Sequence, residues 1–285
     1  MWLRRLWWCR RFHGAQVWLA GCGAVASAVS LAVAPPVSAQ DGATRFEEVG
    51  RFSTEEATQG VAVDAGHFYA ISNRRIGKYD KHTGQRVGGW EGAADGPIIH
   101  LDSGVVLDGL LYCAHSNYPG VPMVSSIEIF ETDTLTHVGS HSFGIFGGSA
   151  TWVDRADGFW WVAFGHYAGR GGVPDQGPAW TNLAKFDDSW RRVGGYVYPG
   201  QVVERFQAMS NSGGAWGEDG RLYATGHDEA IAFVLSLPTA GSVLDLQVTL
   251  PLTSEGQGIA WDRTQPGTLY SILRSSREVV VSTLR

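Results

Sequence analysis

Short apolar stretches, each ended by Gly, Asp or Asn, follow one another along the chain from about residue 46 to its end. None of them continues into the longer periodicity of an extended amphipathic helix. Short strands separated by turn residues are typical of β-sandwiches, β-barrels and β-propellers. The pattern of hydrophobic and polar positions therefore predicts an all-β fold.

One pattern recurs five times and favours the propeller. Each copy has a strand of small and apolar residues, a turn with Asp or Gly, a second strand with a central aromatic residue, and a polar cluster. The copies begin at Gly60, Gly104, Ala150, Gly214 and Gly258. Their aromatic residues, Tyr69, Tyr112, Trp161, Tyr223 and Tyr270, are 43, 49, 62 and 47 residues apart. Repeats of this length are typical of propeller blades.

Three copies continue into a third strand that ends in Tyr or Phe followed by an acid, and then into a fourth strand. The sequence thus predicts five blades of four antiparallel strands. The last copy has residues for only three strands before Arg285, so residues 46–52 are expected to supply the fourth and close the ring. Closure removes the unpaired edges that an open ring would leave. The long interval between residues 167 and 223 leaves a sixth blade open as an alternative.

The first 39 residues have the composition of an export signal. Four arginines and no acids precede an apolar run from about Ala15 to Ala34, and Val37-Ser38-Ala39 matches a small-x-small cleavage site. We therefore expect a signal peptide at 1–39, a single propeller domain at 40–285, and a secreted or periplasmic protein. Lipid anchoring at Cys22, twin-arginine export and an uncleaved anchor are the alternatives.

Charge and cysteine content narrow the function. The leader holds four of the 22 basic residues and none of the 28 acidic ones, so the remaining chain has a formal charge of −10. Such an acidic protein is a poor partner for nucleic acid or for anionic membrane surfaces. Cys113 is the one cysteine after the leader, so no internal disulfide is expected. We expect a small molecule or an oligosaccharide as the ligand.

The polar clusters should meet on one face of the propeller. In each blade, the turn after the second strand and the segment before the first strand lie on the same face. The segments before the first strands include Gln59, Asp102, Ser149 and Ser212. The predicted substrate-binding residues at these places are Asn73, Arg74, Asn117, Asp228, Gln257 and Arg274.

Histidines mark the same positions in several repeats. His115, His166 and His227 follow second strands, and His100 precedes a first strand. As imidazoles they are candidate ligands for a divalent metal, although no short-spacing metal motif is present. Alternatively, His115 or His166 could act as a base, with Tyr118 or Tyr167 as the acid on the same loop. A third possibility is a sugar-binding ring with Trp152, Trp216 and Trp261, which are also expected as packing residues.

Several segments resemble a known family. They are Gly96–Ser103, Cys113–Pro119, Ser125–Phe130, Ser140–Gly144, Thr225–Asp228 and Ala260–Arg263. The chain resembles, over nearly all of its mature part, a family of secreted bacterial and fungal proteins often labelled hypothetical or "cycloisomerase". The resemblance implies a secreted propeller and brings no established activity with it. At the level of fold alone, the chain is also similar to propeller lyases that act on uronic acids.

Together these features predict an exported carbohydrate-active enzyme, a lyase or a hydrolase, with a pocket of His, Tyr and Arg. The alternatives are a non-catalytic glycan-binding propeller and a metal-dependent, lactonase-like hydrolase. The one cofactor considered is a divalent metal ion, which the last alternative would use.

Overall fold

The computed structural model describes residues 44–285 except residue 146. The predicted signal peptide, its cleavage after Ala39 and the alternative lipid site at Cys22 lie outside the described residues. Within them, twenty strands form five four-stranded antiparallel sheets. The predicted β-propeller of five blades with four strands each is therefore confirmed.

Each blade extends from an innermost strand at the axis to an outermost strand at the rim. From inside to outside, blade 1 contains β2 (Gly60–Val63), β3 (His67–Ser72), β4 (Arg75–Asp80) and β5 (Arg86–Glu91). Blade 2 contains β6 (Leu101–Leu107), β7 (Leu110–Ser116), β8 (Ser125–Glu131) and β9 (His137–Gly144). Blade 3 contains β10 (Ser149–Ala156), β11 (Phe159–Gly165), β12 (Asn182–Phe186) and β13 (Arg192–Val197). Blade 4 contains β14 (Gly213–Trp216), β15 (Leu222–Thr225), β16 (Ile231–Ser236) and β17 (Asp245–Pro251). Blade 5 contains β18 (Ile259–Trp261), β19 (Thr268–Leu273), β20 (Glu278–Leu284) and β1 (Phe46–Ser53).

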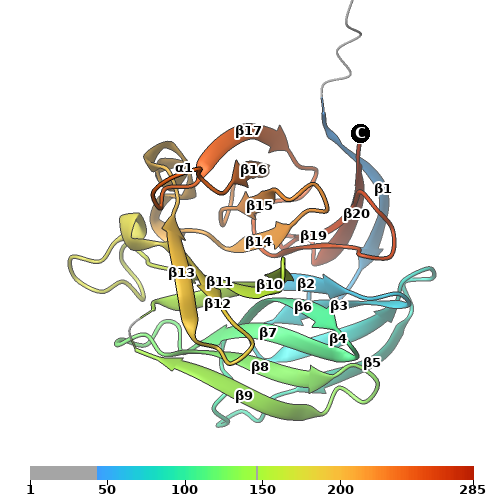
Figure 1. Ribbon diagram of the computed structural model, residues 1–285. Helices are drawn as coiled ribbons and strands as arrows, with labels where there is room; N and C mark the ends of the chain where they lie inside the picture. The colour runs from blue at the N-terminus through green and yellow to red at the C-terminus, as the bar shows by residue number, and fades with distance from the viewer. Residues whose placement is uncertain (1–43, 146) are drawn as a thin grey trace, which may run out of the picture. The chain divides into compact units, whose positions relative to one another are not determined.

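The five sheets surround a common centre, where the innermost strands converge (Figure 1). Each innermost strand contacts the next, and β18 contacts β2, so the ring is closed. The last blade is completed by the N-terminal strand, because β1 pairs antiparallel with β20 from Phe46–Leu284 to Ser53–Glu278. Closure by the segment near residues 46–52 is thus as the sequence predicts.

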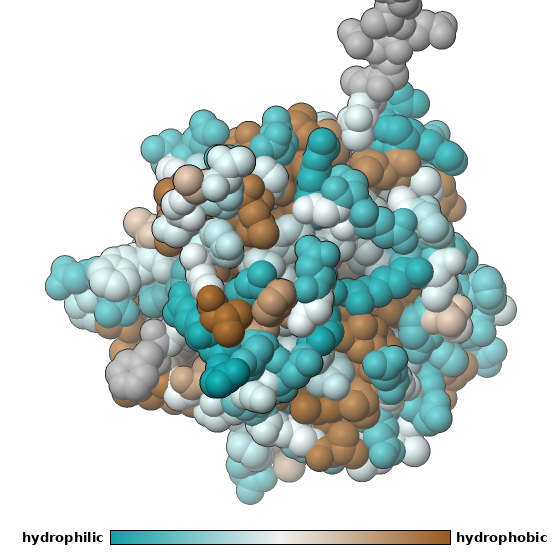
Figure 2. All heavy atoms as spheres, viewed as in Figure 1, coloured by the Kyte–Doolittle hydropathy of each residue, from teal (hydrophilic) through white to brown (hydrophobic). Residues whose placement is uncertain are grey.

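Apolar side chains form one core cluster between each pair of neighbouring blades. Between blades 3 and 4, for example, Trp152 and Trp161 pack with Phe233. Between blades 5 and 1, Tyr270 packs with Phe68. Strand pairing in the ladders stays within each sheet. The blades are therefore held to one another by these side chains and by isolated backbone hydrogen bonds, such as that from the Gly258 N–H to the Gln59 carbonyl at 3.0 Å. Polar residues cover much of the outer surface seen in Figure 2.

Close approach at the axis explains the small residues that begin the repeats. A Cβ atom added at Gly60 would lie 2.6 Å from the Ser103 Cα, and one added at Gly258 would lie 2.6 Å from the Gly60 Cα. The obstructing atoms belong to backbone and cannot rotate away. Three blades therefore meet at Gly60, Ser103 and Gly258, and neither glycine there tolerates a side chain, because it would force the strands apart.

The recurring aromatic residues stabilise the turns between the first two strands. The Tyr69 hydroxyl donates to Asp64 Oδ2 at 2.6 Å, and the Tyr223 hydroxyl donates to Asp219 Oδ2 at 3.0 Å. In these two blades, the tyrosine on the second strand thus anchors the carboxylate of the preceding turn.

The long third interval does not contain a sixth blade. It holds a loop, two 3-10 turns at η1 (Pro178–Trp180) and η2 (Gln207–Met209), and the short helix α1 (Gly200–Phe206). The helix buries Val202 and Phe206 in the core between blades 3 and 4. Among the described residues, no helix has the length and apolar character required to cross a bilayer.

Replacing Gly258 by Ala tests the crowding at the axis. We expect Gly258→Ala to lower the free energy of unfolding by about 1–3 kcal/mol, because the added methyl group meets backbone atoms. Gly50→Ala in β1 is the matched control, since its Cβ would lie 3.8 Å from the Val281 Cβ, an ordinary contact. Chemical denaturation measures both variants. Equal stability of the two would contradict the crowding at the axis.

Candidate functional site

The second strand of each blade ends, and the innermost strand begins, on the same side of the ring, which we name the upper face. A cavity of about 250 Å³ lies at its centre, and we name it the axial cavity. Seven of the predicted site residues line it: Asn73, His100, Tyr118, Tyr167, His227, Gln257 and Arg274. The other five do not: Arg74, His115, Asn117, His166 and Asp228.

Arg274 is held in the cavity by a histidine and a carboxylate. Its Nη1 donates to Nε2 of His227 at 2.8 Å, so this nitrogen must be an acceptor. The His227 Nδ1 then donates to Asp228 Oδ1 at 2.5 Å. The His227 backbone is fixed as well, since its carbonyl accepts from Gln257 Nε2 at 3.0 Å. Among the described residues, no carboxylate forms an ion pair with Arg274, so its charge is available to a ligand.

His100 and Asp102 form a buried pair beside this cation. The His100 Nε2 lies 3.9 Å from Asp102 Oδ2, and the imidazole makes no hydrogen bond within the described part of the chain. Burial, together with the charges of His115 and Arg274, lowers the pKa of His100 to about 4. Burial raises the pKa of Asp102 well above its usual value, against the opposing effects of the Ser103 backbone N–H and Arg274. Burial therefore favours the uncharged form of both side chains.

Two tyrosines form one wall of the cavity. The Tyr118 ring packs on His100 with centroids 5.0 Å apart and on the edge of Tyr167 at 5.1 Å. Arg170 lies over the Tyr118 ring at 5.9 Å. Burial, and next the nearby charge of Asp102, raises the pKa of Tyr167. Tyr167 therefore keeps its proton and can serve as a hydrogen-bond donor.

His115 lies inside blade 2 and does not face the axial cavity. Its Nε2 accepts from the Ile99 backbone N–H at 3.2 Å, and its Nδ1 contacts Ser126 Oγ at 2.8 Å. Ser126 in turn donates to Glu128 Oε1 at 2.5 Å. Both ring nitrogens are thus engaged in a structural network, which gives no support to the predicted role of His115 as a catalytic base.

His166 lines a separate cavity of about 150 Å³ beside the axial one. Its Nε2 contacts the Gly147 carbonyl at 3.0 Å, whereas the neighbouring Tyr167 lines both cavities. The four histidines predicted as metal ligands thus do not converge. In residues 44–285 apart from 146, no three His, Cys, Asp or Glu side chains are placed to hold a metal ion together.

Arg74 and Asn117 stabilise loops rather than the cavity. Arg74 Nη1 donates to the Ala94 carbonyl at 2.6 Å. Asn117 donates to the Pro122 carbonyl at 3.0 Å and accepts from the Val124 N–H at 2.7 Å. Asp228 acts on the cavity indirectly, through His227.

Seven further residues complete the lining, and four of them are polar: Gln59, Asp102, Arg170 and Ser212. Gln59 and Ser212 precede innermost strands and Asp102 is the second residue of β6, so the repeats place all three on this face, as expected from the sequence. Gln59 Nε2 donates to Asn73 Oδ1 at 2.6 Å and orients that amide. Arg170 comes from the glycine-rich loop between β11 and β12, whose path no repeat indicates.

Comparisons with known proteins support the fold. No protein-family model matches the sequence, and no characterised protein matches it by sequence. The glutaminyl cyclase of Myxococcus xanthus has a similar structure, with 12% identity and a TM-score of 0.58 over 85% of this chain and 97% of that protein. The WD40 repeats of RRP9 are similar at 12% identity, with a TM-score of 0.44 over 79% of each chain. At 12% identity, the likeness to the glutaminyl cyclase shows the propeller fold alone.

Replacement of His115 tests its structural role. We expect His115→Ala to lower the free energy of unfolding by about 1–3 kcal/mol, because Ile99 N–H and Ser126 lose a buried partner. His82→Ala, on an exposed turn, should leave stability nearly unchanged. Denaturation curves of both variants measure the difference. A His115→Ala variant as stable as the parent would contradict this role.

The lowered pKa of His100 predicts that stability falls in acid. The unfolded chain binds a proton at this residue near its ordinary pKa of 6.5, whereas the folded protein resists it until about 4. Stability is therefore present above 6.5 and lost as pH falls toward 4, by roughly 2 kcal/mol between about pH 7 and about pH 5. Urea denaturation at the two pH values should show a smaller loss for His100→Gln. An equal loss in parent and variant would contradict the lowered pKa.

Proposed function

We propose that this protein is an exported enzyme that binds a small carboxylate-bearing substrate in the axial cavity and acts on it by acid–base chemistry. The observation that supports this most is the placement of Arg274. A His–carboxylate pair orients this cation, and no described carboxylate neutralises it. The protein has an excess of acidic residues, which repel anions over most of its surface. Arg274 favours an anionic group at the axial cavity.

The size of the cavity limits the substrate. Its volume of about 250 Å³ is below the ~300–1,000 Å³ typical of sites for drug-sized ligands. It suits one sugar-acid unit rather than several units of a polymer. Amide and hydroxyl groups of Asn73, Gln59 and Tyr118 supply donors and acceptors for the hydroxyls of such a ligand. A terminal uronic acid of a glycan matches both the charge and the size.

His100 and Asp102 supply the proton transfer. Burial lowers the pKa of the imidazole to about 4 and raises the pKa of the carboxyl, so both environments favour the uncharged forms. A base and an acid then lie side by side, and one can accept a proton while the other donates one.

A lyase reaction uses each of these groups. Arg274 binds the carboxylate and makes the neighbouring C–H more acidic. The His100 imidazole removes that proton, the electron pair forms the carbon–carbon double bond, and the bond to the leaving oxygen breaks. Asp102 donates its proton to that oxygen, with the tyrosine hydroxyls as hydrogen-bond donors. The same acid could assist attack of water in a hydrolase, so the substrate class is the firmer part of the proposal.

The two predicted arginines form a matched pair for testing. We expect Arg274→Ala to lower kcat/KM on an oligouronide about 10–100-fold, because one charged hydrogen bond to the carboxylate is lost. Arg74→Ala should keep parent activity, since the Arg74 side chain bonds only backbone carbonyls of the neighbouring β5–β6 loop. Ultraviolet absorbance of the unsaturated product measures elimination, and a reducing-sugar assay measures hydrolysis.

The outcome separates binding from chemistry. Asp102→Asn should lower kcat about 10²–10⁴-fold while the uronate still binds, because the amide cannot donate a proton as an acid. Binding of uronates that is unaffected by Arg274→Ala, or the absence of any uronate binding, would contradict the proposal.

The structural similarity to a glutaminyl cyclase suggests a second candidate substrate for the activity assay. The similarity to a glutaminyl cyclase extends over 97% of that protein. A peptide with N-terminal glutamine therefore belongs in the same assay, with release of ammonia as the readout. Turnover of this peptide and not of uronates would replace the carbohydrate substrate by a glutaminyl one.

A further inference from the structure

A second and larger cavity lies on the opposite side of the ring. Its volume is about 610 Å³, and we name it the lower cavity. It is built from the turns that follow the innermost strands of blades 3, 4 and 5, around residues 155–157, 216–220 and 261–263. The innermost strands begin at the upper face and end here, so the two cavities occupy opposite ends of the same strands. The proposed function makes no use of this cavity.

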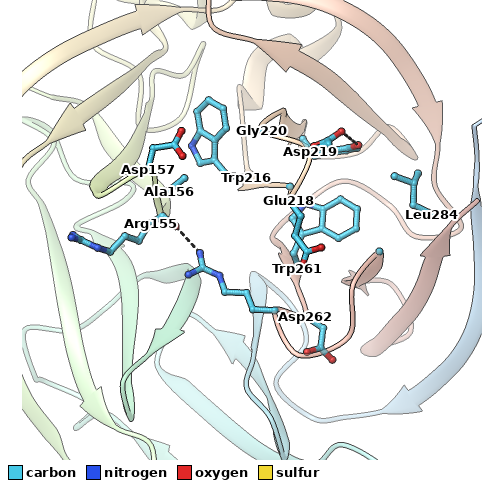
Figure 3. A pocket seen from close by; sticks show the side chains of 14 residues that line it. Arg155, Ala156, Asp157, Trp216, Glu218, Asp219, Gly220, Trp261, Asp262 and Leu284 are labelled. Atoms are coloured by element: carbon cyan, nitrogen blue, oxygen red, sulfur yellow. Dashed lines mark hydrogen bonds between the residues drawn. The ribbon is translucent and has the colours of Figure 1, made fainter.

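Two tryptophans contribute aromatic surface to the lower cavity (Figure 3). Trp261 packs on the edge of Tyr223 with ring centroids 4.9 Å apart, and Trp216 packs on Trp161 at 4.8 Å. These contacts fix both indoles in place before any ligand binds. Trp261 is the more exposed of the two. The third tryptophan considered from the sequence, Trp152, is fully buried and bonded to Asn211, so it can contact no ligand.

Charges of both signs stand around the aromatic surface. Arg155 is paired with Asp188 at 2.6 Å, and Arg263 with Asp154 at 2.6 Å. Arg263 also donates to the Arg155 carbonyl at 2.8 Å, the bond drawn in Figure 3.

Unlike the two arginines, two carboxylates at the rim of the lower cavity have no ion-pair partner among the described residues. They belong to Asp157 and Glu218, both of which are exposed. They are therefore available as hydrogen-bond acceptors, while the paired arginines retain further N–H donors that their carboxylates do not use.

This combination disfavours an anion such as the uronate proposed for the axial cavity, because the free carboxylates repel it. An organic cation would suit the aromatic surface, but it cannot accept hydrogen bonds from the N–H donors of the two paired guanidinium groups, whereas the hydroxyls of a sugar can. A neutral ligand with many hydroxyls fits, because its C–H faces pack on indole while its hydroxyls bond carboxylates and guanidinium groups.

We propose that the lower cavity is a binding site for a neutral saccharide, with Trp261 as the stacking surface and Glu218 as a hydrogen-bond acceptor at the rim. The volume is sufficient for about two sugar units. The site contains no acid–base pair like that of the upper face and functions in binding. It would hold the protein on a neutral glycan while the upper face remains open to its own substrate.

Isothermal titration calorimetry with neutral disaccharides, for example cellobiose and maltose, tests the proposal. We expect at least one of them to bind the parent protein. Glu218→Gln and Trp261→Phe should each weaken binding about three- to ten-fold, through a weaker hydrogen bond and a smaller aromatic face. Glu218 lies on an exposed turn, so this variant reports on binding even if the change at Trp261 alters the packing of blade 5.

Two controls make the result specific. Trp180→Ala removes a more exposed indole from the β11–β12 loop and should leave disaccharide binding unchanged. Arg274→Ala should also leave it unchanged, which separates this site from the axial cavity. The proposal is overturned if no neutral disaccharide binds or if neither site variant weakens binding. It is overturned as well if tetramethylammonium or glucuronate displaces the disaccharide.

Discussion

Crowding at the axis is the constraint on which the rest of this structure depends. Five innermost strands can meet around one point only if the residues at the contact lack side chains or have small ones. Gly60, Ser103 and Gly258 meet this condition, and added methyl groups at the two glycines would overlap backbone atoms. The same crowding closes the middle of the axis, since only a void of about 10 Å³ remains near Val105 and Asp154. Space for ligands is therefore left at the two ends of the strands.

The two ends differ in their electrostatics. At the upper face, Arg274 has no ion-pair partner among the described residues, and burial raises the pKa of the neighbouring Asp102 carboxyl. At the lower face, both arginines are paired and the carboxylates of Asp157 and Glu218 are not. A protein of net negative charge thus offers an anion a favourable location at the upper face. This separation reduces competition between an acidic and a neutral ligand.

The sequence repeats predict much of the fold, and they do so for a physical reason. Each blade needs a small residue at the axis and an aromatic residue that packs beside the first turn, so these residues recur at blade spacing. The repeats also place the polar clusters on one face. They do not show where each side chain points. His115 lies directly opposite Ser126 in the β7–β8 ladder, which directs its ring into the blade, whereas His100 precedes β6 and reaches the cavity. Likewise, burial raises the pKa of Asp102, and burial comes from three-dimensional packing that a local pattern does not contain.

The pairing of β1 with β20 gives the chain a defined order of assembly. Arg45 and Arg285 exchange backbone hydrogen bonds of 3.0 and 2.9 Å, although 240 positions separate them in the numbering. In a chain that emerges N-terminus first, β1 stays without its partner until the last strand has arrived. Blades 1 to 4 are each continuous in sequence and can form as their residues appear, whereas blade 5 forms from both ends at once. Closing so large a loop carries an entropy cost that the sequence-local blades 1 to 4 avoid. A product cut short before residue 278 would leave β1 as an unpaired edge.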